Sequence, residues 1–144
     1  MSYASAGTTI VLLTAALAAD VTSKLMLVVD REDASFQAVT PELPNGPAIA
    51  VLKGDPATGP SDMLLRMPRA RGSLHTHSSD YRLVVVEGRM KHWARGTPEA
   101  EAKPVGPGSF WYQPANQPHA DSCLSDVCLM YISWSGKRDA KLAV

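Results

Sequence analysis

The sequence has no excess of charge of either sign, because 14 lysines and arginines balance 14 aspartates and glutamates. It also lacks a cluster of basic residues, so nucleic acid and anionic membrane surfaces are poor candidates as partners. We expect a neutral or weakly charged substrate instead. No long amphipathic helix, internal repeat or low-complexity segment stands out. A chain of 144 residues with these properties is expected to form one domain with its own core.

Short segments of strand-like composition take the place of helices. Eleven prolines and ten glycines separate them with tight connections, which favours antiparallel strands in a sandwich or barrel. The predicted strands are 36–39, 48–52, 63–67, 74–77, 83–86, 109–113 and 129–134. The last eight residues, 137–144, are expected to be a surface tail.

The N-terminal segment is similar to a secretory signal. Residues 8–17 form an apolar run too short to anchor the chain in a bilayer, and the small residues of Ala16-Leu17-Ala18 close it. No lysine or arginine precedes the run, which departs from the usual signal. We therefore expect a signal peptide at 1–18, one domain at 19–144 and a secreted or periplasmic protein. The alternative is a cytoplasmic protein whose N-terminal strand or helix packs on the domain.

The two cysteines leave two interpretations open. Cys123 and Cys128 flank four residues that would suit a hairpin loop, so they could face each other across an antiparallel pair and form a disulfide. In a cytosolic protein, two buried reduced thiols are the alternative.

Three of the four histidines have the spacing of a metal site. His75 and His77 are two residues apart on a predicted strand, so both imidazoles point to the same face. The turn Pro114-Ala115-Asn116-Gln117-Pro118 would bring His119 onto the start of another strand. We therefore predict that His75, His77 and His119 bind one metal ion. His92 is expected on a solvent-facing hairpin, where its replacement should have little effect.

These residues resemble the two motifs of the cupin superfamily, G-x5-H-x-H-x3,4-E-x6-G and G-x5-P-x-G-x2-H-x3-N. The resemblance covers residues 72–123, and the matching residues are His75, His77, Gly88, Gly108, Pro114 and His119. It implies an all-β cupin-type jelly-roll barrel, or double-stranded β-helix, of antiparallel strands, which often forms a homodimer.

Four positions depart from the motifs. Arg69 replaces the first glycine of motif one, and Tyr81 stands where the metal-binding glutamate belongs. In motif two, Asn116 replaces the second glycine and Cys123 the closing asparagine. The metal-binding histidines are retained while the carboxylate is lost.

The loss of the carboxylate affects the expected metal. An all-imidazole set favours copper or zinc over the harder ions that prefer oxygen ligands. Gln113 is a candidate fourth ligand through its side-chain carbonyl, with hydrogen bonding at the rim of the barrel as the alternative. Asp80 is expected to point to the other face. Tyr81 is a candidate to donate a hydrogen bond or an electron to a bound oxygen species, or else a core tyrosine.

The finer pattern, with Asp80-Tyr81-Arg82 and Ser109-Phe110-Trp111-Tyr112-Gln113-Pro114, resembles compact bacterial cupins and looks similar to secreted copper cupins that cleave cellulose oxidatively. This resemblance implies a copper enzyme that uses dioxygen or hydrogen peroxide on a polysaccharide, with Tyr81 and Gln113 tuning the site. Strand alternation places one of Trp111 and Tyr112 inward and the other outward. The alternatives are a non-redox zinc, nickel, manganese or iron cupin acting on a small oxygenated metabolite, and a metal-binding sensor without catalysis.

Overall fold

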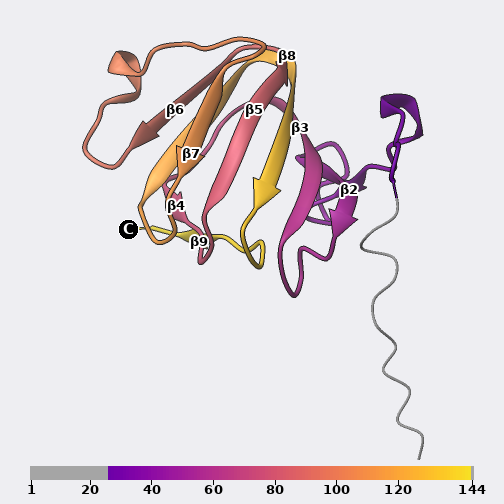
Figure 1. The fold of residues 1–144 in the computed structure, drawn as a ribbon. Helices are drawn as coiled ribbons and strands as arrows, with labels where there is room; N and C mark the ends of the chain where they lie inside the picture. The colour runs from indigo at the N-terminus through magenta and orange to yellow at the C-terminus, as the bar shows by residue number, and fades with distance from the viewer. Residues whose placement is uncertain (1–25, 144) are drawn as a thin grey trace, which may run out of the picture.

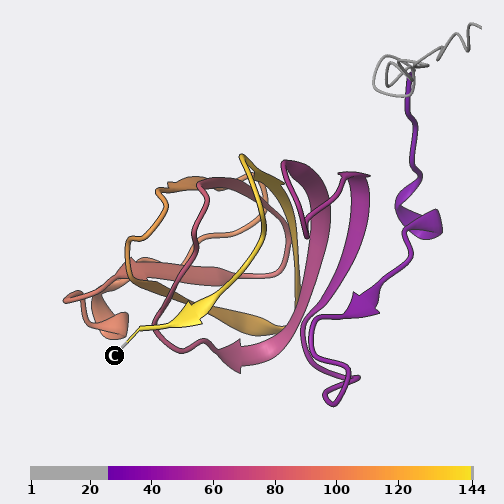
Figure 2. The same cartoon turned by 90° about the horizontal axis from the view of Figure 1, so that it is seen from below.

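The computed structural model describes residues 26–143, which form a curled antiparallel sheet without an α-helix in this range. Figures 1 and 2 show the strands wrapping around one axis from two directions. The expected signal peptide at 1–18 lies outside the described residues. Within them, no helix is long and apolar enough to cross a membrane. The strands are β1 (Gln37–Ala38), β2 (Ala48–Gly54), β3 (Ser61–Arg71), β4 (His75–Thr76), β5 (Tyr81–Glu87), β6 (Met90–Ala94), β7 (Phe110–Gln113), β8 (His119–Trp134) and β9 (Lys141–Leu142), and the 3-10 turns are η2 (Arg31–Asp33) and η3 (Glu99–Glu101).

The longest strand, β8, connects the two sides of the barrel. Its residues 119–123 pair with β6, while residues 129–134 pair with both β3 and β5. β7 extends the sheet beyond β5, and β2 and β1 extend it beyond β3. One strand therefore carries residues of both walls, and its first residue is His119.

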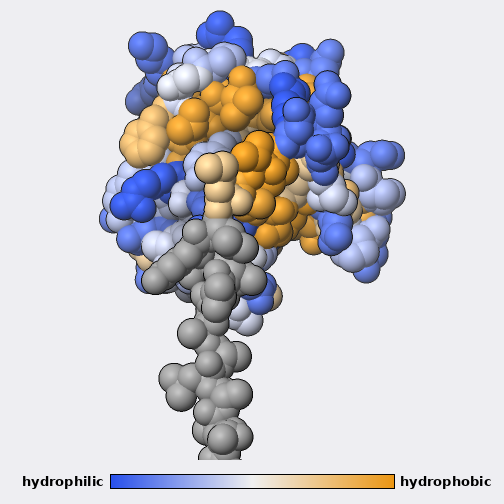
Figure 3. Space-filling view, turned by 45° about the vertical axis from the view of Figure 1, so that its right-hand side comes forward, coloured by the Kyte–Doolittle hydropathy of each residue, from blue (hydrophilic) through white to orange (hydrophobic). Residues whose placement is uncertain are grey.

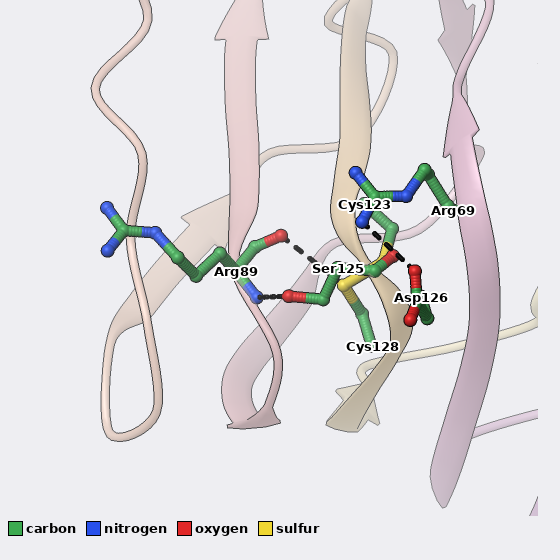
Figure 4. Close-up of a disulfide and its surroundings, with 6 residues drawn as sticks. All are labelled: Arg69, Arg89, Cys123, Ser125, Asp126 and Cys128. Carbon is green, nitrogen blue, oxygen red and sulfur yellow. Dashed lines mark hydrogen bonds and ion pairs between the residues drawn. A yellow bond between two sulfur atoms is a disulfide. The ribbon is translucent and has the colours of Figure 1, made fainter.

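The Cys123–Cys128 disulfide lies at the bend of β8 (Figure 4), with 5.9 Å between the two Cα atoms. Five residues of straight strand would span about 17 Å, so the chain must double back between the cysteines. The Arg89 N–H donates to Ser125 Oγ at 3.0 Å and connects this bend to the turn before β6. The disulfide interpretation is thus confirmed, although both cysteines lie in one bent strand and not on two strands of a hairpin.

The interior follows from the two-residue period of the strands. Met63 and Met67 of β3, Met90 of β6 and Met130 of β8 all belong to the buried core. Methionine side chains are unbranched and flexible, so they fill irregular space between curved walls. A second small cluster contains Trp93, Ala102 and Ala120, with Leu74 packed against it.

Apolar side chains also gather on one face of the surface, around the point where the described chain begins (Figure 3). The segment Met26–Val29 contributes to the exposed apolar surface, with 84% of Val28 accessible. The outward positions of β7, Phe110 and Tyr112, are exposed as well.

Two sequence-based predictions about strands were wrong. Met90–Ala94 is strand β6 and pairs with β8, so the side chain of His92 is half-buried and does not lie on a solvent-facing hairpin. Residues 137–144 are not simply a surface tail, because Lys141 and Leu142 form β9 and pair with β4. Both strands are short, and their pairing depends on partner strands distant in sequence.

Candidate metal centre

The backbone brings the three motif histidines together directly. His75 on β4 is the register partner of His119 on β8, so the two strands place these side chains next to each other. His77 follows β4, and its carbonyl oxygen accepts a hydrogen bond from the Asn116 N–H at 2.8 Å. Asn116 has a φ of 60°, a left-handed conformation that asparagine adopts more readily than most residues. The predicted turn before His119 is therefore fastened to the His77 backbone.

Each of the three imidazole rings is oriented by a backbone carbonyl. The Nδ1–H of His75 donates to the Ser73 oxygen at 2.8 Å and that of His119 to the Gln117 oxygen at 2.9 Å. The Nδ1–H of His77 donates to the Asp139 oxygen. These bonds fix the tautomer and leave each Nε2 unprotonated, with its lone pair available as an acceptor, which is the arrangement of metal-binding histidines.

The rings also converge in space. Their centroids are separated by 4.4 Å for His75 and His119, 4.8 Å for His75 and His77, and 5.1 Å for His77 and His119. The candidate ligand atoms all lie within 4.8 Å of one another. Three oriented imidazoles at this separation fit a single metal ion such as zinc or copper.

Burial keeps two of these rings neutral. It lowers the pKa of His77 to about 4 and that of His119 to about 3, and the neighbouring histidines lower both further. Both lowered pKa values lie well below neutral pH. Since only the neutral ring offers a lone pair, His77 and His119 can bind a cation without first losing protons.

Tyr81 occupies the place of the missing glutamate. It is 4% exposed, and its hydroxyl donates to His119 Nε2 at 3.3 Å while accepting from the Trp111 indole N–H at 3.4 Å. Burial is the main cause of the raised pKa of this phenol. Tyr81 therefore presents a neutral hydroxyl beside a ligand atom, where a cupin glutamate would present a negative charge.

Gln113 is buried and fully engaged in hydrogen bonds. Its amide nitrogen donates to the oxygens of Pro114 and Gln117 at 3.0 and 3.2 Å, and its Oε1 accepts from His92 Nε2 at 3.1 Å. These bonds secure the turn that precedes His119. The carbonyl oxygen expected as a fourth metal ligand thus faces His92.

His92 is part of the surroundings of the site. Its ring stacks on Trp111 with centroids 4.8 Å apart and lies 5.2 Å from the ring of His119. Burial lowers its pKa. The expectation that His92 faces solvent is therefore wrong, because the pairing of β6 with β8 turns this side chain inward.

The remaining predicted orientations agree with the structure. Trp111 is directed inward, whereas Tyr112 lies on the outer face with 46% of its surface exposed. The Asp80 carboxylate accepts from the Ala115 N–H at 2.8 Å and from the Tyr112 hydroxyl at 2.9 Å. Asp80 is thus turned away from the histidines, as strand alternation predicts.

His75 and His77 border a cavity of about 200 Å³ inside the barrel, which two charged residues missed by sequence reasoning also line. Asp121 is one of them. It follows His119 by two residues on β8, and this spacing was an available signal because such residues share a face. Burial raises the pKa of Asp121, while the charges of His75 and His92 act in the opposite direction.

The second missed residue is Arg138, which also lines the cavity. It lies in the segment before β9 that the sequence suggested was a surface tail. No local pattern marks this residue, because its position depends on the docking of the C-terminal segment. Its backbone N–H donates to the Pro56 oxygen at 2.8 Å, which holds this segment against the loop between β2 and β3.

Comparison with known proteins identifies the family of the chain and shows which solved structures share its fold. Residues 16–141 match the family described as "Domain of unknown function (DUF4437)". No curated protein matches the chain. Among solved structures, KdgF from Halomonas sp. is 21% identical with a TM-score of 0.61, over 80% of this chain and 96% of that one. An RmlC-like cupin from Shewanella frigidimarina is 17% identical with a TM-score of 0.60, over 77% and 91% of the two chains.

The DMSP lyase DddQ from Ruegeria pomeroyi is also similar, with 17% identity and a TM-score of 0.61. The alignment covers 76% of this chain and 61% of the lyase, so the chain spans less than two thirds of the length of that relative. At these identities the likeness shows the fold, which confirms the predicted jelly-roll barrel. The fold is that of the RmlC-like cupins, and the chain belongs to the DUF4437 family, whose match covers most of its length.

Proposed function

We propose that this protein is a metal-dependent enzyme that acts without redox chemistry on a small oxygenated molecule bound inside the barrel. The observation that carries the proposal is the convergence of His75, His77 and His119. Two of these histidines, His75 and His77, line a cavity together with Tyr81 and Asp121. A cavity of about 200 Å³ suits a molecule smaller than most drug-sized ligands. A polysaccharide chain would need an open groove.

The residues of the cavity supply the means for proton transfer. A divalent metal held by the three imidazoles would act as a Lewis acid toward a substrate oxygen. Burial raises the pKa of the Asp121 carboxyl, which brings a carboxyl group closer to the range where it exchanges protons at neutral pH. The neutral Tyr81 hydroxyl can donate a hydrogen bond to an oxygen that becomes negative during the reaction.

The structural neighbours include enzymes, which supports an enzymatic function at the level of the fold. They include DMSP lyases and the polyketide cyclase RemF from Streptomyces resistomycificus, the latter 17% identical with a TM-score of 0.62 over 83% of this chain and 87% of that one. Lyase and cyclase activities among proteins of this fold are compatible with chemistry in such a cavity.

A second candidate is the copper-dependent oxidation of a polysaccharide such as cellulose, with dioxygen or peroxide as co-substrate. The all-nitrogen ligand set favours it, because Tyr81 replaces the carboxylate that harder metals prefer. The disulfide at the bend of β8 supports the export that this function requires, since such bonds persist in oxidising compartments. A metal sensor without turnover is the third possibility.

The deciding experiment loads the full-length protein separately with Zn(II), Ni(II), Mn(II), Fe(II) and Cu(II) and measures bound metal. Hydrogen–deuterium exchange at carbons beside carbonyl groups is then followed by NMR in a panel of small hydroxy and oxo compounds. We expect exchange that depends on metal and is lost in Asp121→Asn, which should retain the metal. Exchange that is equal in wild type and Asp121→Asn would contradict the role of Asp121.

The same samples test the alternatives. A Cu(II) paramagnetic resonance signal with nitrogen hyperfine structure, together with oxidised ends released from cellulose, would favour the copper oxidase. Stoichiometric metal without turnover in either assay would favour the sensor.

A further inference from the structure

A positively charged side chain in the cavity wall has no counterion among the residues that the structure describes. Arg138 lines the cavity and is partly buried, yet its guanidinium makes no hydrogen bond or ion pair with any described residue. Loss of hydration lowers its pKa, and no acidic neighbour raises it. Arginine remains protonated under these conditions, so a partly buried positive charge is left without compensation.

Asp139, the acidic residue next to Arg138 in the sequence, already has hydrogen-bond donors for its carboxylate. The carboxylate of Asp139 accepts from the Ser78 N–H at 2.8 Å and from the Ser78 hydroxyl at 2.7 Å. Asp139 also accepts the Nδ1–H of His77 at its backbone oxygen. The residue next to Arg138 therefore serves to hold β4 and His77, and Arg138 is left facing the cavity.

The two charged residues of the cavity act on different histidines. The charge of Arg138 influences His77, whereas that of Asp121 influences His75 and His92. Arg138 is the only lysine or arginine among the residues described as lining this cavity. A basic side chain, Arg138, therefore acts on His77, and an acidic one, Asp121, acts on His75.

The rest of the cavity wall is largely apolar. It includes Leu83, Ile132 and the side chains Met63, Met67, Met90 and Met130. A ligand that satisfies both the wall and the guanidinium needs an apolar body and one compact anionic group. A carboxylate matches a single guanidinium, because its two oxygens can accept two parallel N–H bonds.

We infer that the substrate is a small organic carboxylate and that Arg138 binds its carboxylate group. The inference deepens the proposed function, on which it rests for the identity of the site, and it replaces the neutral substrate expected from the balanced charge of the whole chain. Arg138 would position the substrate so that its other end lies between the candidate metal ligands and Asp121.

The test compares two probes of nearly equal shape, 3-methylbutanoate and its neutral amide, 3-methylbutanamide. Binding is measured by calorimetry at pH 8 with the metal-free full-length protein, so that no metal competes for the carboxylate. We expect wild type to prefer the acid by about tenfold or more, the range of a charge-assisted hydrogen bond. Arg138→Gln should lose this preference, and Arg138→Lys should keep only part of it.

Arg89→Gln is the matched control. Arg89 is exposed, its side chain extends away from the disulfide (Figure 4), and it does not line the cavity, so the variant removes one positive charge without touching the cavity. It should retain the wild-type preference. Equal binding of acid and amide by wild type, or a preference that survives Arg138→Gln, would overturn the inference.

Failure of the proposed function would look different. If wild type holds no metal and shows no exchange chemistry but still prefers the acid through Arg138, the carboxylate site stands and the metal-dependent reaction does not. If Arg138→Gln retains metal, a lost preference reports on substrate binding alone.

Discussion

Among single residues, the Nδ1 bonds of the histidines decide what the site can do. The Asp139 carbonyl orients His77 from a segment 62 residues away in sequence, and local carbonyls orient His75 and His119. Because these acceptors belong to the backbone, they remain in place when a ring is replaced. The orientation of each ring therefore depends on the fold rather than on another side chain.

Replacing His77 by alanine should abolish stoichiometric metal binding while the barrel still folds. One of three imidazole ligands is lost, but the core consists of aliphatic and methionine side chains that do not depend on the metal. Metal analysis and circular dichroism check both parts. Unfolding of the alanine variants of all three histidines would instead indicate a structural metal.

Replacing His92 by alanine should lower the free energy of unfolding by about 1–2 kcal/mol, because the hydrogen bond to Gln113 and the stacking on Trp111 are both lost. Urea titration measures this change, with exposed Arg89→Ala as the control for a replacement near β6. An unchanged unfolding midpoint would restore the sequence-based expectation that His92 contributes little.

Among the strands, β8 has the largest effect on the site. It supplies His119, Asp121 and both cysteines, and its bend passes the chain from the β6 side to the β5 side. Gly88, which leads into β6, has a φ of +82°, and a Cβ there would lie 2.7 Å from the Val127 oxygen. Only glycine fits this close approach between the turn and the bend.

Removal of the disulfide through the Cys123→Ala, Cys128→Ala double variant should cost about 2 kcal/mol, as expected for cross-linking a loop of this length. Metal affinity should stay close to wild type, since Cys123 lies about 13 Å along the strand from His119. Thermal unfolding with and without reductant measures the first effect, and metal titration the second. A reductant that leaves the melting temperature of wild type unchanged would contradict a stabilising role.

For the molecule as a whole, the buried histidines predict how stability varies with pH. The pKa values of His77 and His119 are lowered in the folded state to about 4 and about 3, from an ordinary value of 6.5. The unfolded chain therefore binds more protons between pH 6.5 and about 3. The contribution of these two neutral rings to the free energy of unfolding is complete above pH 6.5, and it is lost as the pH falls through this window.

Urea unfolding of the metal-free protein, repeated across this pH window, measures how steeply the free energy of unfolding changes with pH. His119→Gln should show a shallower pH dependence than wild type, because one of the two titrating groups is removed. An equally steep slope in this variant would assign the effect to other residues.

Self-association is also predicted for the whole molecule. The exposed apolar face in Figure 3 and the homodimer implied by the cupin resemblance both lead to the expectation of a dimer. Light scattering coupled to gel filtration should return twice the chain mass of 15.4 kDa. A mass equal to one chain across a range of concentrations would contradict it.

The sequence by itself determined the parts of the protein that depend on local chemistry. The turn residues and the strand alternation predicted most of the strands, and the His75–His77 spacing with the turn before His119 predicted the three-histidine cluster. Side-chain direction on a strand repeats every two residues, and a tight turn needs only its own residues. Both can therefore be read without knowledge of the partner strands.

Only the tertiary structure decided which other groups surround the histidines. His92 turns inward because β6 pairs with β8, and Arg138 reaches the cavity because β9 pairs with β4. Asp121 had a local signal, but its burial depends on the opposite wall of the barrel. These placements result from pairings between segments distant in the chain, and a cavity exists only once several such segments enclose it.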